Sequence, residues 1–250
     1  MVAGTDQISE RNTARPDTGH PRAVRFQVLG WVVLGITVAL NIASMAVPAL
    51  IDSPLTRDRG EIQNYLDVFI EGNLPTWWSV ALLTTAALTH ALVGALASAK
   101  QVRGAWAWFA SAAMLALLSL DDHTQLHERL DRIGNQLVTF ERFPFYWLIP
   151  GVAAGAVVAF ALLLLAVRLH GVARWYMVAG CALLLGSALG MEALQGLLIA
   201  KGESGPIYVL TYHAEELGEN LGVLLMLAAA IASLAITRHD HRVELDHVQG

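Results

Sequence analysis

The sequence predicts an all-α integral membrane protein: a bundle of six transmembrane helices with short amphipathic helices on its outer side. Hydrophobic residues make up 55% of the 250 residues and charged residues only 15%, whereas about a quarter of the residues in a soluble domain are charged. The mean hydropathy of the chain is +0.51. Six apolar runs each approach the roughly 20 residues that a helix needs to cross a bilayer; they cover residues 27–50, 76–98, 104–122, 146–167, 174–199 and 208–236.

The first apolar run begins near Phe26 and continues to Ile51, which is longer than the roughly 7–15-residue core of a cleaved signal peptide. We therefore interpret it as a retained helix. The polar residues 1–25 before it predict a disordered cytoplasmic tail. The six-helix transmembrane domain then covers residues 26–237, and a polar cytoplasmic tail covers 238–250.

The distribution of Lys and Arg predicts the orientation of the helices. Ten of the 16 Lys and Arg residues lie in the two tails and in the connections at 99–103 and 168–174, and a basic excess marks the cytoplasmic side. Tryptophans agree with this orientation, since such residues gather at membrane interfaces: Trp31, Trp106, Trp108 and Trp175 at the inner ends, and Trp77, Trp78 and Trp147 at the outer ends. We expect a multi-pass protein of the cell membrane with both termini in the cytoplasm.

Two outer segments have the apolar spacing of surface helices. Residues 61–71 carry apolar side chains at helical intervals with acids between them, which predicts a short helix on the membrane surface. Residues 126–137 repeat the pattern after the third run, so the helix is expected to continue or resume there until Pro144.

Ionisable residues gather at three places along the apolar runs. The third run ends in Asp121 to Glu128, the fifth contains Glu192, and the sixth opens with His213 to Asn220. Glu192 is about 8 residues, or about 12 Å, below the outer end of its helix at 1.5 Å per residue. All three groups are therefore expected at overlapping depths in the outer part of the membrane.

Helical periodicity assigns each group to a face. His213, Glu216 and Asn220 share one side of their helix with Glu219 beside them, and Glu192 shares a side with Gln195, flanked by the small Ala188 and Gly196. In the third group, Asp121, Gln125 and Glu128 form one stripe, and His123 with His127 form another. Periodicity leaves open which stripe faces the bundle.

Converging acids at membrane depth need protonation, a cation or a metal, because each costs about 2.5–3.5 kcal/mol to insert as a charge. Asp, Glu and imidazole together suit a divalent ion such as Zn, Mn or Fe, and His213-x-x-Glu216 reverses the Glu-x-x-His pair of two-metal bundles. The predicted metal ligands are Asp121, His127, Glu128, His213 and Glu216. The predicted catalytic acid–base residues are Glu192, Glu219 and Asp122.

These residues favour a metal-dependent membrane enzyme, an oxidoreductase or hydrolase acting on a lipid or another membrane-soluble small molecule, although the sequence leaves open whether the chain is an enzyme. Three alternatives remain: a proton or cation transporter, a haem b protein with axial ligands such as His127 and His213, and a non-catalytic membrane scaffold. His90, in the inner half of the second run, is expected to make an interhelical hydrogen bond. The net charge of −5 excludes a basic surface for nucleic acid.

Two segments carry a resemblance. Gly72-Asn73-Leu74-Pro75-Thr76-Trp77, followed by Ser119-Leu120-Asp121 with His127-Glu128, resembles a pattern in uncharacterised bacterial polytopic membrane proteins. The resemblance covers most of the membrane part of the chain and implies no activity.

Overall fold

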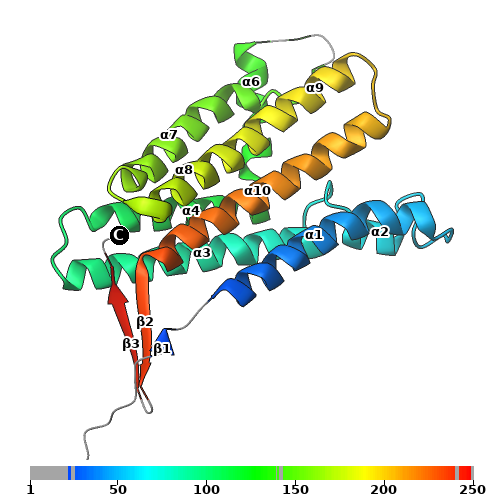
Figure 1. The fold of residues 1–250 in the computed structure, drawn as a ribbon. Coiled ribbons are helices and arrows are strands. Elements are labelled where there is room, and N and C mark those ends of the chain that lie inside the picture. The colour runs from blue at the N-terminus through cyan, green and yellow to red at the C-terminus, as the bar shows by residue number, and fades with distance from the viewer. Residues whose placement is uncertain (1–21, 24–25, 139, 141–142, 240–241, 249–250) are drawn as a thin grey trace, which may run out of the picture.

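A computed structural model describes residues 22–23, 26–138, 140, 143–239 and 242–248 of the chain (Figure 1). The predicted tail at 1–25 therefore falls mostly outside the described residues. The described chain is mainly helical, which confirms the all-α class. Each of the six apolar runs contains a long helix: α1 (Gln27–Leu50), α3 (Leu74–Ala99), α4 (Trp106–Thr124), α7 (Leu148–Ala166), α8 (Gly171–Leu185) with its continuation, and α10 (Pro206–Ala232).

The fifth run forms one 30-residue rod, because α8 continues through a π-helical segment, η1 (Gly186–Met191), into α9 (Glu192–Ala200). A π-helical turn adds a residue to the local repeat, and such turns are frequent at functional sites. Here the π-helical turns end directly before Glu192. The helical register that places this carboxyl is therefore set by η1.

Four of the helical segments in the described chain are long and apolar enough to cross a membrane: α1, α3, α7 and the rod from Gly171 to Ala200. Helices α4 and α10 are not among them; α4 ends in Asp121 and Asp122, and α10 carries three glutamates in its first half. A total of six membrane spans thus remains a prediction, because it needs α4 and α10, which carry these acids, to cross the membrane as well.

Close packing at small residues joins α10 to the rod. A Cβ on Gly180 would lie 2.7 Å from the Gly222 carbonyl oxygen, and one on Gly222 would lie 2.6 Å from the Leu184 nitrogen. Both distances are shorter than van der Waals contact, so only glycine permits this backbone approach. The crossing fixes α10, and with it the acids of its first half, against the rod.

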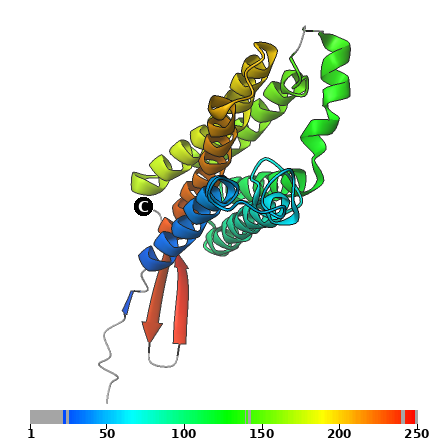
Figure 2. The same ribbon diagram turned by 90° about the vertical axis from the view of Figure 1, so that its right-hand side faces the viewer.

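The short helices on either side of α3 and α4 differ from their predicted lengths. Helix α2 (Glu61–Leu66) ends before residue 71, and the segment after α4 is broken into α5 (Leu126–Arg129) and α6 (Asp131–Leu137) instead of one helix. Seen from the side, these short helices after α4 stand beside the main bundle (Figure 2). Asn73 explains where α3 begins: its side chain accepts a hydrogen bond from the Thr76 N–H and donates to the Asp67 carbonyl, at 3.3 and 2.6 Å.

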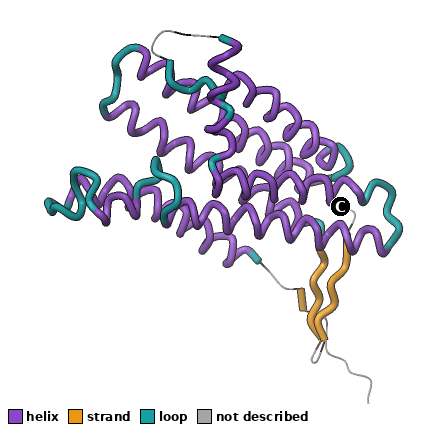
Figure 3. Tube along the Cα trace, turned by 180° about the vertical axis from the view of Figure 1, so that it is seen from behind, coloured by secondary structure: helices purple, strands orange, loops and turns teal. Residues whose placement is uncertain are grey.

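A small sheet lies at the opposite end of the bundle (Figure 3). The order β1 (Arg22–Ala23), β2 (Leu234–His239), β3 (Arg242–His247) is antiparallel throughout. The sequence predicted none of these strands, and it extended the sixth run to residue 236, whereas α10 ends at Ala232. Part of the predicted polar tail at 238–250 therefore forms a hairpin.

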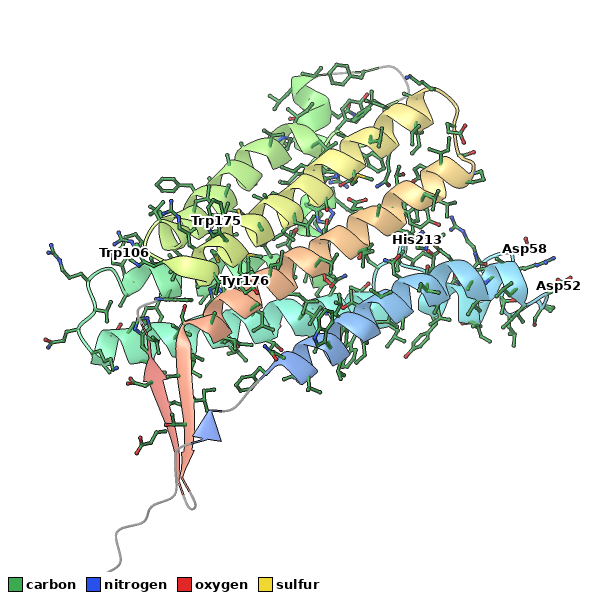
Figure 4. The ribbon with its side chains drawn as sticks, in the orientation of Figure 1. Asp52, Asp58, Trp106, Trp175, Tyr176 and His213 are labelled. Carbon is green, nitrogen blue, oxygen red and sulfur yellow. The ribbon has the colours of Figure 1, made fainter. Side chains whose placement is uncertain are left out.

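The predicted tryptophan anchors differ in their exposure. In Figure 4, Trp106 and Trp175 lie at one end, and Asp52 and Asp58 lie at the other. Trp106 and Trp175 are exposed, as interfacial anchors would be. Trp108 and Trp147 are instead buried, at 4% and 8% exposed, so neither side chain is an anchor at the surface.

Candidate metal centre

One group of three side chains in the described chain has the geometry of a metal site. Glu71, His127 and Glu128 each offer a ligand atom, and these atoms all lie within 4.8 Å of one another. Glu71 comes from the connection between α2 and α3, whereas His127 and Glu128 lie on α5. Imidazole with two carboxylates is a donor set that suits Zn, Mn or Fe.

A left-handed residue makes the turn that presents His127. Gln125 ends α4 with φ 54° and ψ 42°, a conformation that costs a non-glycine residue roughly 1–3 kcal/mol and that clusters at functional sites. The turn lets the Asp121 side chain reach forward: Oδ1 accepts the His127 backbone N–H at 2.8 Å, and Oδ2 lies 3.0 Å from Nδ1. Since a carboxylate only accepts, Nδ1 carries the hydrogen and Nε2 is left for a ligand.

The capping segment of α3 holds Glu71. The next residue, Gly72, donates its N–H to the Thr76 hydroxyl at 3.1 Å, and the Gln125 side chain is a neighbour of the Glu71 carboxyl. Its Oε2 is buried with no hydrogen-bond partner, and a buried unpaired acceptor is costly. Burial raises the pKa of Glu71 to about 7. A bound cation or a proton would therefore stabilise this carboxyl.

His127 supplies positive charge when no metal is bound. Burial opposes protonation, but the hydrogen bond and charge of Asp121, with the charges of Glu192 and Glu71, outweigh it and raise the pKa of His127 to about 9. A protonated His127 therefore offsets part of the acidic charge. A divalent ion would have to displace that proton.

A second set of acids lies next to this group and is called the acidic layer: Asp122, Glu192, Glu215, Glu216 and Glu219. Side chains of neighbouring segments donate hydrogen bonds to three of them. Trp147 Nε1–H donates to Glu192 Oε1 at 2.6 Å, and the Trp147 ring lies 4.8 Å, between centroids, from the His127 ring. The Ser79 hydroxyl donates to Asp122 Oδ2 at 2.6 Å. The Gln195 side chain donates to Glu215. Glu192 therefore faces the bundle, connected to His127 through one indole.

Glu216 and Glu219 complete this layer on α10. The charged neighbours of Glu219 are Glu216, Glu215, Asp122 and Glu192, from three helices. Glu216 has Asp122, Glu215 and Glu71 as its charged neighbours. The acids of separate segments thus lie in one region, which is the relationship that the sequence predicted.

The predicted residues divide into three sets. His127 and Glu128 lie in the three-residue group. Asp121 positions His127, while Asp122, Glu192, Glu216 and Glu219 lie in the acidic layer below. His213 is apart from both: its Nε2 lies 3.1 Å from Ser44 Oγ on α1, and its Nδ1 lies 2.8 Å from the Val209 oxygen (Figure 4). With both ring nitrogens engaged, His213 lends no support to a metal or haem ligand role.

His90 has the structural contacts that were expected of it. It is fully buried, with Nε2 3.1 Å from the Met226 oxygen on α10 and Nδ1 2.9 Å from Ser111 Oγ on α4. One imidazole thus joins three helices in the apolar part of the bundle. Its ring nitrogens are both satisfied, and it is far along α3 from the capped end beside Glu71.

Glu71 was missed by sequence reasoning, which counted it within a surface helix. Its position directly before the Gly72-to-Trp77 segment was the available signal. No curated protein and no solved structure matches the chain. Residues 33–234, which include every helix from α2 to α10 and most of α1, match a family described as a domain of unknown function, DUF8692. The chain therefore belongs to this uncharacterised family.

Proposed function

We propose that the chain is a multi-pass cell-membrane protein in which Glu71, His127 and Glu128 bind a divalent metal near the extracytoplasmic end of a six-helix bundle. The observation that carries the proposal is the approach of three ligand atoms, from two separate segments, to within 4.8 Å of one another. Four apolar helices support membrane insertion. The basic connections at the opposite end favour both termini in the cytoplasm.

The donor set suits a catalytic ion better than a purely structural one. Three protein ligands leave a coordination position for water or substrate, as catalytic zinc sites do. Such an ion lowers the pKa of bound water and polarises an ester or phosphoryl oxygen. Hydrolysis of a lipid-like substrate is the reaction we favour, and an oxidoreductase is the second reaction class that the same donors would support.

The carboxyls of the acidic layer would act as general acid and general base. Glu192 accepts a hydrogen bond from the indole that contacts His127, so it lies next to the ligand set without belonging to it. Glu219 and Asp122 belong to the same acidic layer. A carboxyl in this position is placed to take a proton from an attacking water and return it to a leaving group.

Elemental analysis of the detergent-purified protein tests the metal. We expect about one Zn, Mn or Fe per chain in the wild type, and its loss in His127→Ala and Glu71→Gln. Glu61→Gln, which makes the same change at an exposed glutamate at the start of α2, should retain the ion. Glu216→Ala decides whether this predicted ligand also binds the metal.

Turnover is tested with the same variants in proteoliposomes of phosphatidylethanolamine and phosphatidylglycerol, with released fatty acids and head groups measured by mass spectrometry. We expect product only with metal-loaded wild type and Glu61→Gln. If the protein binds metal but releases no product, the metal site would stand and the enzyme proposal would fail for these lipids. Turnover by metal-free protein would contradict the proposal that the reaction requires a metal.

A proton or cation transporter is the second candidate, and the acidic layer favours it. Glu216 and Glu219 extend the acids from the outer group into α10, and intramembrane acids mark ion pathways. His90 lies deeper in the bundle, but both of its ring nitrogens are already hydrogen bonded in an apolar core. It therefore does not extend the acidic layer into a continuous proton pathway. Proton uptake into liposomes that is lost in Glu216→Gln but kept in His127→Ala would favour transport over the enzyme.

A further inference from the structure

A cavity of about 120 Å³ lies at the other end of the bundle, away from the acids. This is well above the roughly 10–15 Å³ that a cavity needs to hold one water molecule. The cavity lies where the α3–α4 and α7–α8 connections meet the ends of α10 and β3. Figure 1 shows these elements together at the end that carries the sheet.

Two arginines line this cavity. Arg103, Arg168 and His170 are among its lining residues, and none of the described lining residues is acidic. The Arg168 guanidinium lies over the Trp106 ring, 5.0 Å from its centroid, so its position is fixed by stacking. Lys100 and Asp246 pair with each other nearby, so this acid leaves the two arginines uncompensated.

Two helices also begin at the cavity. The first turn of α8, Gly171 to Ala173, lines the cavity, as does Ala105, the N-cap residue of α4. Neither helix has a side-chain cap at this end. At α4 the N–H groups of Ala105, Ala107 and Trp108 are bonded to backbone carbonyls, so the first turn of α8 is the one whose free N–H groups and positive dipole end favour a bound anion.

An unpartnered buried histidine adds an independent indication of a ligand. His247 lines the cavity and is only 8% exposed, and its Nδ1 is buried without a hydrogen-bond partner. Its backbone carbonyl is held by Lys100 Nζ at 3.2 Å, which fixes the end of β3. A buried imidazole nitrogen left unpaired is costly unless a ligand in the cavity satisfies it.

We propose that this cavity binds a phosphate group, held by Arg103, Arg168, His247 and the first turn of α8. Guanidinium groups and helix N-termini are the donors that phosphate oxygens prefer. The same chemistry serves inorganic phosphate and the head group of a phospholipid. The exposed Trp106 and Trp175 at this end (Figure 4) lie where an interface would bring head groups within reach.

Calorimetric titration of the full-length protein in an uncharged detergent tests this site. The probes are sodium phosphate, against sodium chloride at matched ionic strength, and dioctanoyl phosphatidate, against uncharged dioctanoylglycerol. We expect saturable phosphate-group binding that weakens about tenfold in Arg168→Gln and in Arg103→Gln. Arg174→Gln is the matched control, because it removes an exposed arginine from α8 that does not line the cavity.

The two probes separate the source of the phosphate group. Binding of both supports a site for free phosphate, and saturable binding of phosphatidate alone supports a lipid head group. Arg168→Gln also loses its stacking on Trp106, which could weaken binding indirectly. His247→Phe keeps both arginines and is expected to weaken phosphate binding as well, because it removes the unpaired ring nitrogen. Absence of saturable binding to either probe, or equal weakening in Arg174→Gln, would overturn the proposal.

Discussion

Asp121 binds His127 twice, at the backbone and at the ring. One carboxylate oxygen accepts the His127 N–H at 2.8 Å and the other lies 3.0 Å from Nδ1. This double contact crosses the left-handed turn at Gln125 and fixes which ring nitrogen faces Glu71 and Glu128. Carboxylates that orient a histidine ligand in this way typically affect metal affinity about 10–100-fold.

Asp121→Asn should therefore weaken metal binding without abolishing it. The amide oxygen can still accept the backbone N–H, but the charge that favours the Nδ1–H tautomer is lost. We expect affinity to fall about 10–100-fold, measured by competition with a chelating dye, whereas His127→Ala should abolish specific binding. Unchanged affinity in Asp121→Asn would show that His127 is not oriented by Asp121 in the bound state.

The metal-free protein should become less stable as the pH rises. Burial raises the pKa of Glu71 from 4.5 to about 7, so its contribution is full below about 4.5 and is lost as the pH rises through 7. The pKa of His127 is raised from 6.5 to about 9, because Asp121, Glu192 and Glu71 outweigh its burial. Its contribution is full below 6.5 and is lost as the pH rises through 9.

The measurement is the Tm of EDTA-treated protein across this pH range. We expect a continuous fall, with the part near pH 7 reduced in Glu71→Gln and the part near pH 9 reduced in His127→Gln. Adding metal should flatten the curve, because the ion replaces the protons. A Tm that rises between pH 7 and 9 in the metal-free wild type would contradict the assignment.

The long helices were predictable because they depend on local composition. The run at 27–50 became α1 with the same bounds, since apolar length alone decides it. His213 was not predictable in the same way: periodicity put it on the Glu216 side of α10, but its ring turns to Ser44 of α1. A helical wheel assigns a direction and does not say which neighbour lies there.

The candidate centre was predictable only in part for a similar reason. Apolar spacing put His127 and Glu128 at an outer helix end, but the partner Glu71 is more than 50 residues away in sequence and arrives through the fold of the α2–α3 connection. The left-handed Gln125 has no composition signal, because glycine or asparagine is the residue expected there. Long-range partners and unusual backbone conformations are what the sequence left undetermined.

Gly180→Ala and Gly222→Ala should both destabilise the bundle. Each new methyl would meet backbone atoms of the facing helix, at 2.7 and 2.6 Å, so α10 and the rod would have to separate. We expect a loss of about 1–3 kcal/mol in unfolding free energy, measured by denaturant titration in mixed micelles. Gly190→Ala is the control on the same rod, since nothing lies within 4 Å of its added Cβ; destabilisation by this control would contradict the packing argument.

His90→Leu should lower stability while leaving the metal in place. The substitution leaves the Ser111 hydroxyl without its 2.9 Å partner in a buried site, which costs about 1–3 kcal/mol. Metal content by elemental analysis should match the wild type, because His90 is not in the Glu71–His127–Glu128 group. Loss of metal or of proton uptake at unchanged stability would instead place His90 on a functional path.

Trp147→Phe separates the acidic layer from the ligand set. Phenylalanine keeps an aromatic ring beside His127 but removes the indole N–H that donates to Glu192 at 2.6 Å. We expect unchanged metal content, a loss of about 1–3 kcal/mol in stability, and reduced turnover, since the orientation of Glu192 depends on that hydrogen bond. Trp77→Phe, at an exposed tryptophan, is the control. Turnover that survives Trp147→Phe but not Glu192→Gln would show that Glu192 acts without this hydrogen bond, whereas turnover that survives both would remove Glu192 from the acid–base role.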